Sequence, residues 1–251
     1  MSRKTRFRFL LCDLDDTLYP LDAGVMKAVG ERISRFMVER LDIPPQIAPQ
    51  LRASFHERYG TSMRGLMLHY GIDPEGYLEF VHDLPLADYI RPNPALDSML
   101  AGVCLTPVIF TNASREHALR VLDHLGVRHR FEQIIDVRDF GFHSKPHPMA
   151  YEHSLHLLGA QPEECIIVED SARNLAPARA MGMLGVLVGN GCSTPRTACG
   201  TNAVQQEHNA ADIYIDSILE LGQAIQPLIE RMSESASRRM TESVGQRNPT
   251  R

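Results

Sequence analysis

Short apolar runs that each stop at a polar residue recur through this sequence, and they restrict its fold more than any other feature. Runs of four or five residues are too short for most buried helices, and they are typical of parallel strands covered on both faces. Five such runs occupy residues 9–12, 107–110, 133–137, 165–168 and 185–188. Stretches with helical spacing separate the later runs. We therefore predict an α/β fold with a Rossmann-like parallel sheet and helices on both faces.

The segments between the runs have the features of helices that end at glycine. Residues 115–125 repeat apolar side chains at helical intervals before Gly126, and residues 147–158 precede Gly159. Glycine is favoured just after a helix because it adopts the left-handed backbone conformation at little cost. The next helical segment contains Pro177, which predicts a kink or a late start.

Residues 21–90 differ from the rest because they contain no convincing buried strand. They open with a good amphipathic helix pattern, and further helical segments follow. We predict that residues 1–20 and 91–230 build the α/β core and that residues 21–90 are an inserted all-helical cap. Inside the core, residues 190–211 are expected to form a long loop. The polar residues 231–251 are expected to be a disordered tail.

Composition excludes several functional classes. The 251 residues carry a formal net charge of −5 and show no basic face of the kind that a nucleic-acid polymer needs. No apolar run is long enough to cross a membrane, and the apolar stretch near the N-terminus is too short for a signal peptide. Five cysteines without a Cys-x-x-Cys pair suit a reducing compartment. We expect a cytoplasmic protein with a small-molecule partner, and the sequence leaves its oligomeric state open.

Polar side chains with complementary chemistry follow the apolar runs. They are Asp13 and Asp15 after the first run, Thr111 after the second, Glu169 and Asp170 after the fourth, and Lys145 in the loop before it. Parallel strands end at one edge of a sheet, so these residues are expected to meet there. Clustered carboxylates suit Mg²⁺, and a lysine with a hydroxyl suits a phosphoryl group. Taken singly, an aspartate at a strand end is more often a helix cap or a solvated residue than a catalytic one.

These residues resemble the four motifs of the haloacid dehalogenase superfamily, and they occur in the same order. "DLDDT" is similar to the first motif, Asp-x-Asp-x-Thr, and "IFTNA" is similar to the second, with Thr111 at its key position. Lys145 resembles the lysine of the third motif. "IIVEDSARN" resembles the fourth, with Glu169 and Asp170 as its acidic pair. The helical insertion resembles the cap that follows the first strand in part of this superfamily.

The resemblance implies a phosphatase that works through an aspartyl-phosphate. Asp13 would be the nucleophile, and Asp15 would protonate the leaving alcohol and then activate water. Thr111 and Lys145 would bind the phosphoryl oxygens and balance their charge. Asn112 would help to position the phosphoryl group.

The resemblance also implies a Mg²⁺ site. Asp13, the backbone carbonyl of Asp15 and Asp170 would hold the ion, with Glu169 as a direct or water-mediated ligand. Dehalogenases of the superfamily lack an acid at the position of Asp15, so its presence favours phosphate esters over halides. Asp16 has no evident chemical role and is expected to be solvated or to act as a cap.

Finer likeness points to the pyrimidine 5′-nucleotidase branch of the superfamily. "DLDDTLYP", "YGTSMRGL", "YIRPNPAL", "VIFTNA" and "EDSARN" all resemble that branch, which implies a nucleoside monophosphate such as UMP or CMP as substrate. Glu169 departs from it, since an aspartate is more usual there. Cap side chains that could face the nucleotide are Tyr59, Thr61, Met63, Arg64 and His69.

Two other functions remain open at this point. A sugar-phosphate phosphatase or a phosphomutase would use the same four motifs. A non-catalytic regulatory protein could keep the fold, but it should have lost at least one charged motif residue, and this chain retains all of them.

Overall fold

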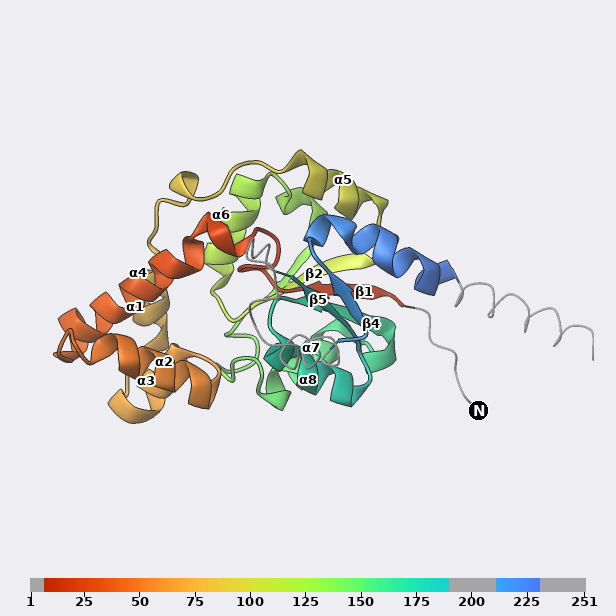
Figure 1. Ribbon diagram of the computed structural model, residues 1–251. Coiled ribbons are helices and arrows are strands. Elements are labelled where there is room, and N and C mark those ends of the chain that lie inside the picture. Colours follow the sequence, from red (N-terminus) through yellow and green to blue (C-terminus); the bar gives the residue numbers. More distant parts are fainter. Residues whose placement is uncertain (1–6, 190–210, 231–251) are drawn as a thin grey trace, which may run out of the picture.

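The computed structural model describes residues 7–189 and 211–230, which fold into a parallel sheet with helices on both faces (Figure 1). This architecture confirms the fold class expected from the sequence. The predicted tail and nearly all of the expected long loop lie outside the described residues. Within the described ranges, no helix is both long and apolar enough to cross a membrane.

Six strands form the sheet in the order β3-β2-β1-β4-β5-β6, and each neighbouring pair is parallel. The strands are β1 (Phe9–Cys12), β2 (Thr106–Phe110), β3 (Gln133–Ile135), β4 (Cys165–Glu169), β5 (Leu184–Val188) and β6 (Ile213–Ile215). β1 lies in the middle, hydrogen-bonded to β2 on one side and to β4 on the other. The residues that follow these three strands are therefore immediate neighbours.

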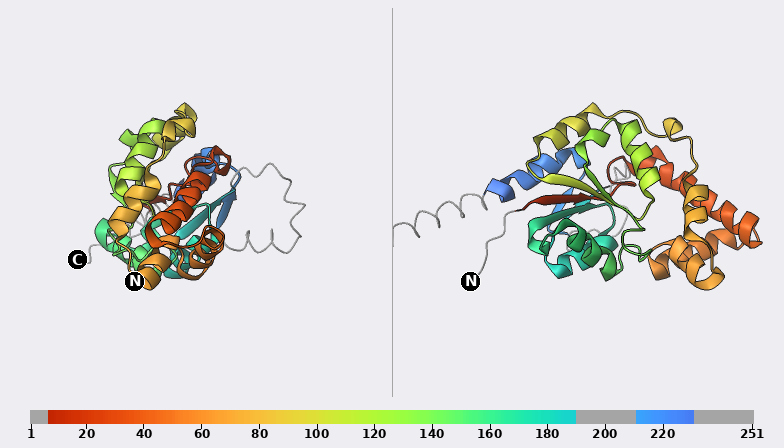
Figure 2. Two further views of the ribbon diagram at one scale, coloured as in Figure 1. Left: turned by 90° about the vertical axis from the view of Figure 1, so that its left-hand side faces the viewer. Right: turned by 180° about the vertical axis from the view of Figure 1, so that it is seen from behind.

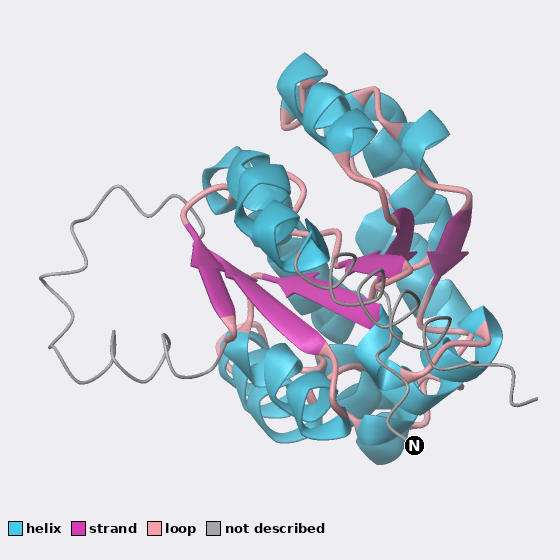
Figure 3. Cartoon of the chain, turned by 90° about the vertical axis from the view of Figure 1, so that its right-hand side faces the viewer, coloured by secondary structure: helices cyan, strands magenta, loops and turns pink. Residues whose placement is uncertain are grey.

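Helices cover both faces of the sheet (Figure 3), and strand side chains alternate between two apolar layers. Leu10 and Cys12 belong to the layer under α5 and α6, whereas Leu11 belongs to the layer under α7 and α8. These helices are α5 (Pro94–Gly102), α6 (Arg115–Leu125), α7 (Pro148–Leu158) and α8 (Ala172–Met181). Residues 221–230 add a further helix, whose Leu221 and Ile225 belong to the same apolar layer as α5 and α6.

The helix ends follow the local signals in the sequence. Gly126 and Gly159 adopt left-handed conformations, with φ of 77° and 56°, directly after α6 and α7, as predicted. Ser114 caps the start of α6 by accepting a hydrogen bond from the backbone N–H of His117. Pro177 lies inside α8, so the alternative of a late helix start is wrong.

Four helices lie beyond the carboxyl end of β1, apart from the sheet (Figure 2). They are α1 (Val25–Leu41), α2 (Ala48–Tyr59), α3 (Ser62–Tyr70) and α4 (Pro74–His82). The ring of Phe36 meets that of Tyr77 edge-on at 5.1 Å between centroids and joins α1 to α4. Gly65 lets α3 approach α2, because an added Cβ would come within 2.3 Å of the Phe55 side chain. We refer to these four helices as the cap. The assignment of residues 21–90 to a separate domain stays a prediction.

The cap contacts the core close to the strand ends. Arg173 of α8 donates a hydrogen bond of 3.0 Å to the backbone carbonyl of His56 in the cap. Gly60 has a φ of +87°, and a Cβ placed there would lie 2.7 Å from the backbone oxygen of Lys145. A side chain at position 60 would therefore push the cap away from the core.

Candidate active site

The ends of β1, β2 and β4 bring the predicted site residues to one edge of the sheet. Asp13 directly follows β1, Thr111 directly follows β2, and Glu169 is the last residue of β4. The register places Cys12 beside both Ile109 and Val168, so the residues that follow lie next to one another. Residues separated by more than 150 positions in the chain thus share one small space.

Lys145 reaches this edge from the loop between β3 and α7, and its side chain is only 1 % exposed. Its Nζ donates to Asp13 Oδ1 at 2.8 Å, to Glu169 Oε1 at 2.6 Å and to the Phe110 carbonyl at 2.7 Å. All three hydrogens of the ammonium therefore have an acceptor. The lysine joins the ends of the three central strands.

Asn112 fixes the backbone of Lys145 by a double hydrogen bond. Its Oδ1 accepts from the Lys145 N–H at 2.7 Å, and its Nδ2 donates to the Lys145 carbonyl at 3.1 Å. The side chain was expected to position a phosphoryl group. In the structure it engages the peptide of the lysine, and its role toward a phosphoryl group stays a prediction.

The pKa values of the three buried charged groups at this edge are all raised, for different reasons. Burial raises the pKa of Asp13 above its usual value, although the charge of Lys145 opposes that effect. The pKa of Glu169 is also raised, first by burial and then by the charge of Asp13. Burial would lower the pKa of Lys145, but Asp13 and Glu169 outweigh it and raise the pKa. The lysine stays charged, and the excess negative charge favours a further cation.

Asp15 has a set of partners that differs from that of Asp13. Tyr19 donates its O–H to Asp15 Oδ1 at 2.6 Å, and His117 donates from Nε2 to the same oxygen at 2.9 Å. Burial would raise the pKa of Asp15, but the charge and hydrogen bond of His117, with the Tyr19 bond, lower it. Thr17 donates to Asp13 Oδ2 at 3.1 Å, so this threonine supports Asp13.

Three carboxylates are placed so that they could share a metal ion. One oxygen each from Asp13, Glu169 and Asp170 lies within 4.8 Å of the others. Such a set of hard oxygen ligands fits Mg²⁺. Glu169 uses Oε1 for Lys145 and Oε2 for the amide of Asn174 at 3.1 Å, which fits a water-mediated contact better than a direct one. The backbone carbonyl of Asp15 stays a predicted ligand of this site.

Asp16, which is expected to be solvated or to act as a cap, is buried and not solvated. It is 9 % exposed and takes a left-handed conformation with a φ of 58°. Burial raises the pKa of Asp16 to about 7, and the charges of Asp170, Asp15 and Asp13 add to that effect. A fifth acid at this edge, beside Asp13, Asp15, Glu169 and Asp170, strengthens the case for a bound cation.

A cavity of about 550 Å³ lies between this edge and the cap. That size suits a small organic ligand. The core contributes acids and Thr111, while the cap contributes apolar side chains together with Arg52 and His56. Of the five cap residues proposed to face a substrate, Thr61 and Met63 line the cavity. Tyr59 and His69 are instead hydrogen-bonded to each other, with 2.6 Å between the tyrosine oxygen and Nε2.

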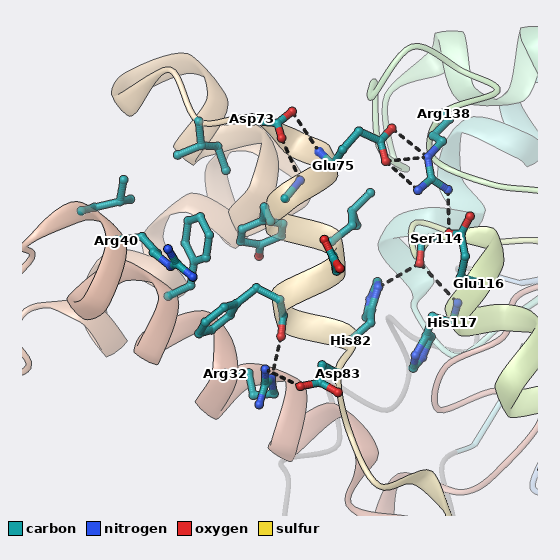
Figure 4. A pocket seen from close by; sticks show the side chains of 18 of the residues that line it. Arg32, Arg40, Asp73, Glu75, His82, Asp83, Ser114, Glu116, His117 and Arg138 are labelled. Carbon is teal, nitrogen blue, oxygen red and sulfur yellow. Dashed lines mark hydrogen bonds and ion pairs between the residues drawn. The ribbon is translucent and has the colours of Figure 1, made fainter.

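A second cavity, of about 1250 Å³, lies on the other side of α4 (Figure 4). Arg138 of the core bridges its two walls. The guanidinium contacts Glu75 of α4 at 2.6 Å, Glu116 of α6 at 3.0 Å and Asp136 at 2.8 Å. This arginine ties the cap to the core beside the end of β3, because Asp136 directly follows that strand.

Sequence reasoning did not identify four of the residues that complete the site: Tyr19, Arg52, His117 and Arg173. Tyr19 lies two residues after the first motif and Arg173 lies within the fourth, so nearness to a motif was an available signal. Arg52 and His117 lie inside helices. No spacing rule connects either of them to the strand ends.

The fold and the site together define the class. The protein has a Rossmann-like parallel sheet with a lysine-bridged acidic pair at its strand ends and a helical insertion after the first strand. The chain belongs to the haloacid dehalogenase-like hydrolases, because the model of that family matches residues 7–182.

Individual relatives are distant. The chain is 28% identical over 186 residues to "Phosphate metabolism protein 8" of Saccharomyces cerevisiae, a match that covers 68% of this chain and 58% of that protein. It thus spans somewhat more than half the length of that relative. It is also 28% identical over 183 residues to a fructose-1-phosphate phosphatase of Escherichia coli, covering 71% of this chain and 94% of the relative.

A solved structure of β-phosphoglucomutase from Clostridium difficile has a similar fold. The TM-score is 0.58 with 20% sequence identity, and the alignment covers 93% of this chain and 100% of the other. At this identity the likeness concerns the fold alone.

Proposed function

We propose that this hydrolase is a Mg²⁺-dependent phosphomonoesterase that works through an aspartyl-phosphate and acts on a pyrimidine nucleoside 5′-monophosphate such as UMP or CMP. The observation that carries the chemistry is the contrast between Asp13 and Asp15. One carboxylate is bonded to Lys145 and Thr17, and the other is bonded to Tyr19 and His117. Two carboxyl groups in different environments can take two different roles.

The first step divides between these two residues. A carboxylate oxygen of Asp13 forms a bond to phosphorus while the ester P–O bond breaks, and the leaving oxygen takes a proton from Asp15. A phosphoryl dianion raises the pKa of a neighbouring carboxyl, since like charges disfavour the ionised form. Substrate binding therefore favours the protonated Asp15 that this step needs.

The second step restores the enzyme. Water forms a bond to phosphorus and gives a proton to Asp15, while the bond between phosphorus and Asp13 breaks and inorganic phosphate leaves. Lys145 and the Thr111 hydroxyl balance charge on the phosphoryl oxygens in both steps. Asp13, Asp170 and the carbonyl of Asp15 would hold Mg²⁺, with Glu169 acting through water. The ion supplies positive charge that offsets the repulsion between carboxylate and phosphate.

The cavity supports a substrate that has an apolar face and acceptor oxygens. Val29, Ile33 and Met63 line its cap side, and Arg52 lies among them. A pyrimidine ring has flat apolar faces, and its carbonyl oxygens accept hydrogen bonds from a guanidinium. The volume of about 550 Å³ is compatible with a mononucleotide.

The test is phosphate release from a substrate panel with Mg²⁺ present. The panel contains UMP, CMP, dUMP, dTMP, AMP, GMP and fructose 1-phosphate. The proposal expects the highest kcat/KM for a pyrimidine nucleotide and no release in excess chelator. A preference for the sugar phosphate would contradict the substrate assignment, and full activity in chelator would contradict the metal.

A sugar-phosphate phosphatase or phosphomutase is the second candidate. It is supported by the relative that carries the name fructose-1-phosphate phosphatase and by the fold shared with a phosphoglucomutase. The same panel separates these activities, because a mutase converts its sugar phosphate into an isomer without net release of phosphate. A non-catalytic regulatory protein would release phosphate from no member of the panel.

A further inference from the structure

Two hydrogen bonds to the Asp15 side chain end on the same oxygen. The Tyr19 hydroxyl and the His117 Nε2–H both donate to Oδ1, at 2.6 and 2.9 Å. Among the described residues, Oδ2 accepts no hydrogen bond, and Asp15 lines the catalytic cavity. One oxygen is thus held by the protein and the other is left for the reaction.

His117 is placed in an unusual way for a residue with only a packing role. Its side chain is 0 % exposed, and its Nδ1 is buried without a hydrogen-bond partner in the described part of the chain. An apolar residue would fill the same space without leaving a polar atom unsatisfied. The Nε2 contact with Asp15 is therefore the feature that distinguishes histidine from leucine at this position.

The ring of His117 is held in place by the cap. His82, the last residue of α4, stacks on it with 4.3 Å between centroids and 20° between planes. His82 Nδ1 is also hydrogen-bonded to Ser114 Oγ at 3.1 Å, and the same oxygen accepts from the backbone N–H of His117. Figure 4 shows the two rings side by side, one from the cap and one from α6.

We infer that His117 is a positioning residue for Asp15, that it acts together with Tyr19, and that the stacking of His82 makes this arrangement depend on the seated cap. The inference rests on the proposed function, because it assigns a task to the residue that handles the proton there. Holding Oδ1 restricts rotation of the carboxyl group and leaves Oδ2 aimed at the leaving oxygen. Fixing a proton donor in this way gives an advantage that a freely rotating carboxyl lacks.

Comparing substrates with different leaving groups distinguishes a positioning role from misfolding, because misfolding lowers the activity with every substrate alike. An alkyl phosphate such as UMP releases a basic alkoxide that needs a proton, whereas p-nitrophenyl phosphate releases a stable anion. The measurement is kcat/KM, because it reports the steps up to phosphoryl transfer and leaves out hydrolysis of the intermediate. The alkyl substrate is the best one found in the panel.

We expect His117→Leu to lower kcat/KM for the alkyl phosphate by about 10²-fold and for p-nitrophenyl phosphate by less than about threefold. His117→Gln keeps an N–H donor at a similar reach and should recover at least about tenfold of the loss. His124→Leu on the same helix is the matched control. Equal losses with both substrates, or no loss with either, would overturn the inference.

A second set of variants covers the case in which His117→Leu does not fold. Tyr19→Phe removes only the other donor to Oδ1 and should give the same selectivity for leaving group, with a loss of about tenfold. His82→Leu should give a smaller loss of the same kind. In an Asp15→Asn background, these substitutions should have no further effect beyond about threefold, since residues that act through one group are not additive. Full effects in that background would contradict positioning.

A failure of the proposed function can be distinguished from a failure of the role inferred for His117. If Asp13→Asn hydrolyses both substrates as the unmodified protein does, the aspartyl-phosphate route is wrong. If Asp13→Asn is inactive but the leaving-group selectivity is absent, only the role of His117 is wrong.

Discussion

The core side and the cap side of the catalytic cavity handle charge differently. On the core side, Lys145 has three acceptors and Asp15 has two donors. On the cap side, Arg52 forms no ion pair within the described residues, and its Nε is buried without a hydrogen-bond partner. Gly30 gives the guanidinium room, because an added Cβ would lie 3.0 Å from one of its nitrogens.

This difference assigns the reaction to the core side and the choice of substrate to the cap side. Groups that are already bonded in the free protein keep their geometry when a substrate arrives, which suits the reaction centre. A buried donor without a partner is costly until a ligand supplies the acceptor. We therefore expect core substitutions to affect every substrate and cap substitutions to affect some substrates only.

The largest expected effect is that of Asp13→Asn. An amide is a poor nucleophile, so hydrolysis of every phosphomonoester should fall by at least about 10⁴-fold. Phosphate release from UMP and from p-nitrophenyl phosphate measures the effect, and circular dichroism confirms that the variant is folded. Hydrolysis at the unmodified rate would remove the basis for the assignment of the nucleophile.

Lys145→Met should lower activity by about 10²- to 10³-fold with every substrate and should also destabilise the fold. Without the ammonium, Asp13 and Glu169 remain buried with uncompensated charge, which costs about 3–5 kcal/mol. The structure has a matched control in Lys27→Met on the exposed surface of α1. Thermal melting and phosphate release measure the two effects.

The pH dependence of the same variant gives a further check. The pKa values of Asp13 and Glu169 are already raised, and loss of the lysine removes the charge that opposes this. A carboxyl group whose pKa is higher in the folded protein than in the unfolded chain binds its proton more tightly in the folded state. Stability of Lys145→Met should therefore fall as the pH rises from the ordinary carboxyl pKa to the raised one. A melting temperature that rises over that interval would contradict the pairing.

Arg52→Met tests the cap side. Loss of a charged hydrogen bond to the substrate should lower kcat/KM for the preferred nucleotide by about 10- to 100-fold. Hydrolysis of p-nitrophenyl phosphate should change by less than about twofold, since that compound carries no carbonyl oxygen for the guanidinium. Arg58→Met, exposed on the same helix, is the control. Equal losses with both substrates would contradict the assignment of substrate selection to the cap side of the cavity.

The smallest effect is expected at Tyr59. Its hydroxyl is hydrogen-bonded to His69, and neither residue lines the cavity. Tyr59→Phe should therefore leave the order of preferred substrates unchanged and alter kcat/KM by less than about twofold, since truncation at a surface site usually has little effect. A reversal of preference would mean that the cap changes its arrangement when substrate binds.

Much of the fold was predictable because it depends on local patterns. The runs that contain Leu11 and Ile167 are apolar enough to identify buried strands, and Gly126 marks a helix end without any knowledge of its surroundings. The strand-end acids were also accessible, since parallel strands must place their carboxyl ends together.

The supporting residues were not accessible in this way. His117 is 102 positions from Asp15, and in the sequence it resembles any histidine on a buried helix face. Asp16 follows two acids and was expected to be solvated or to act as a cap, but the turn after β1 buries it. The task of Asn112 depends on where the chain returns 33 residues later. Such contacts depend on tertiary packing, and no periodic pattern in the sequence reveals them.

Arg138 has a consequence for how this protein should be handled in solution. Its contacts with Glu75 and Glu116 involve carboxylates that are 51% and 68% exposed, so dissolved ions compete with them. Screening becomes effective at about 10 Å in 0.1 M salt and at shorter range above it. A change in ionic strength is therefore expected to change how firmly the cap is attached to the core, whether or not a substrate is bound. Rates of two variants are comparable only when they are measured in the same salt.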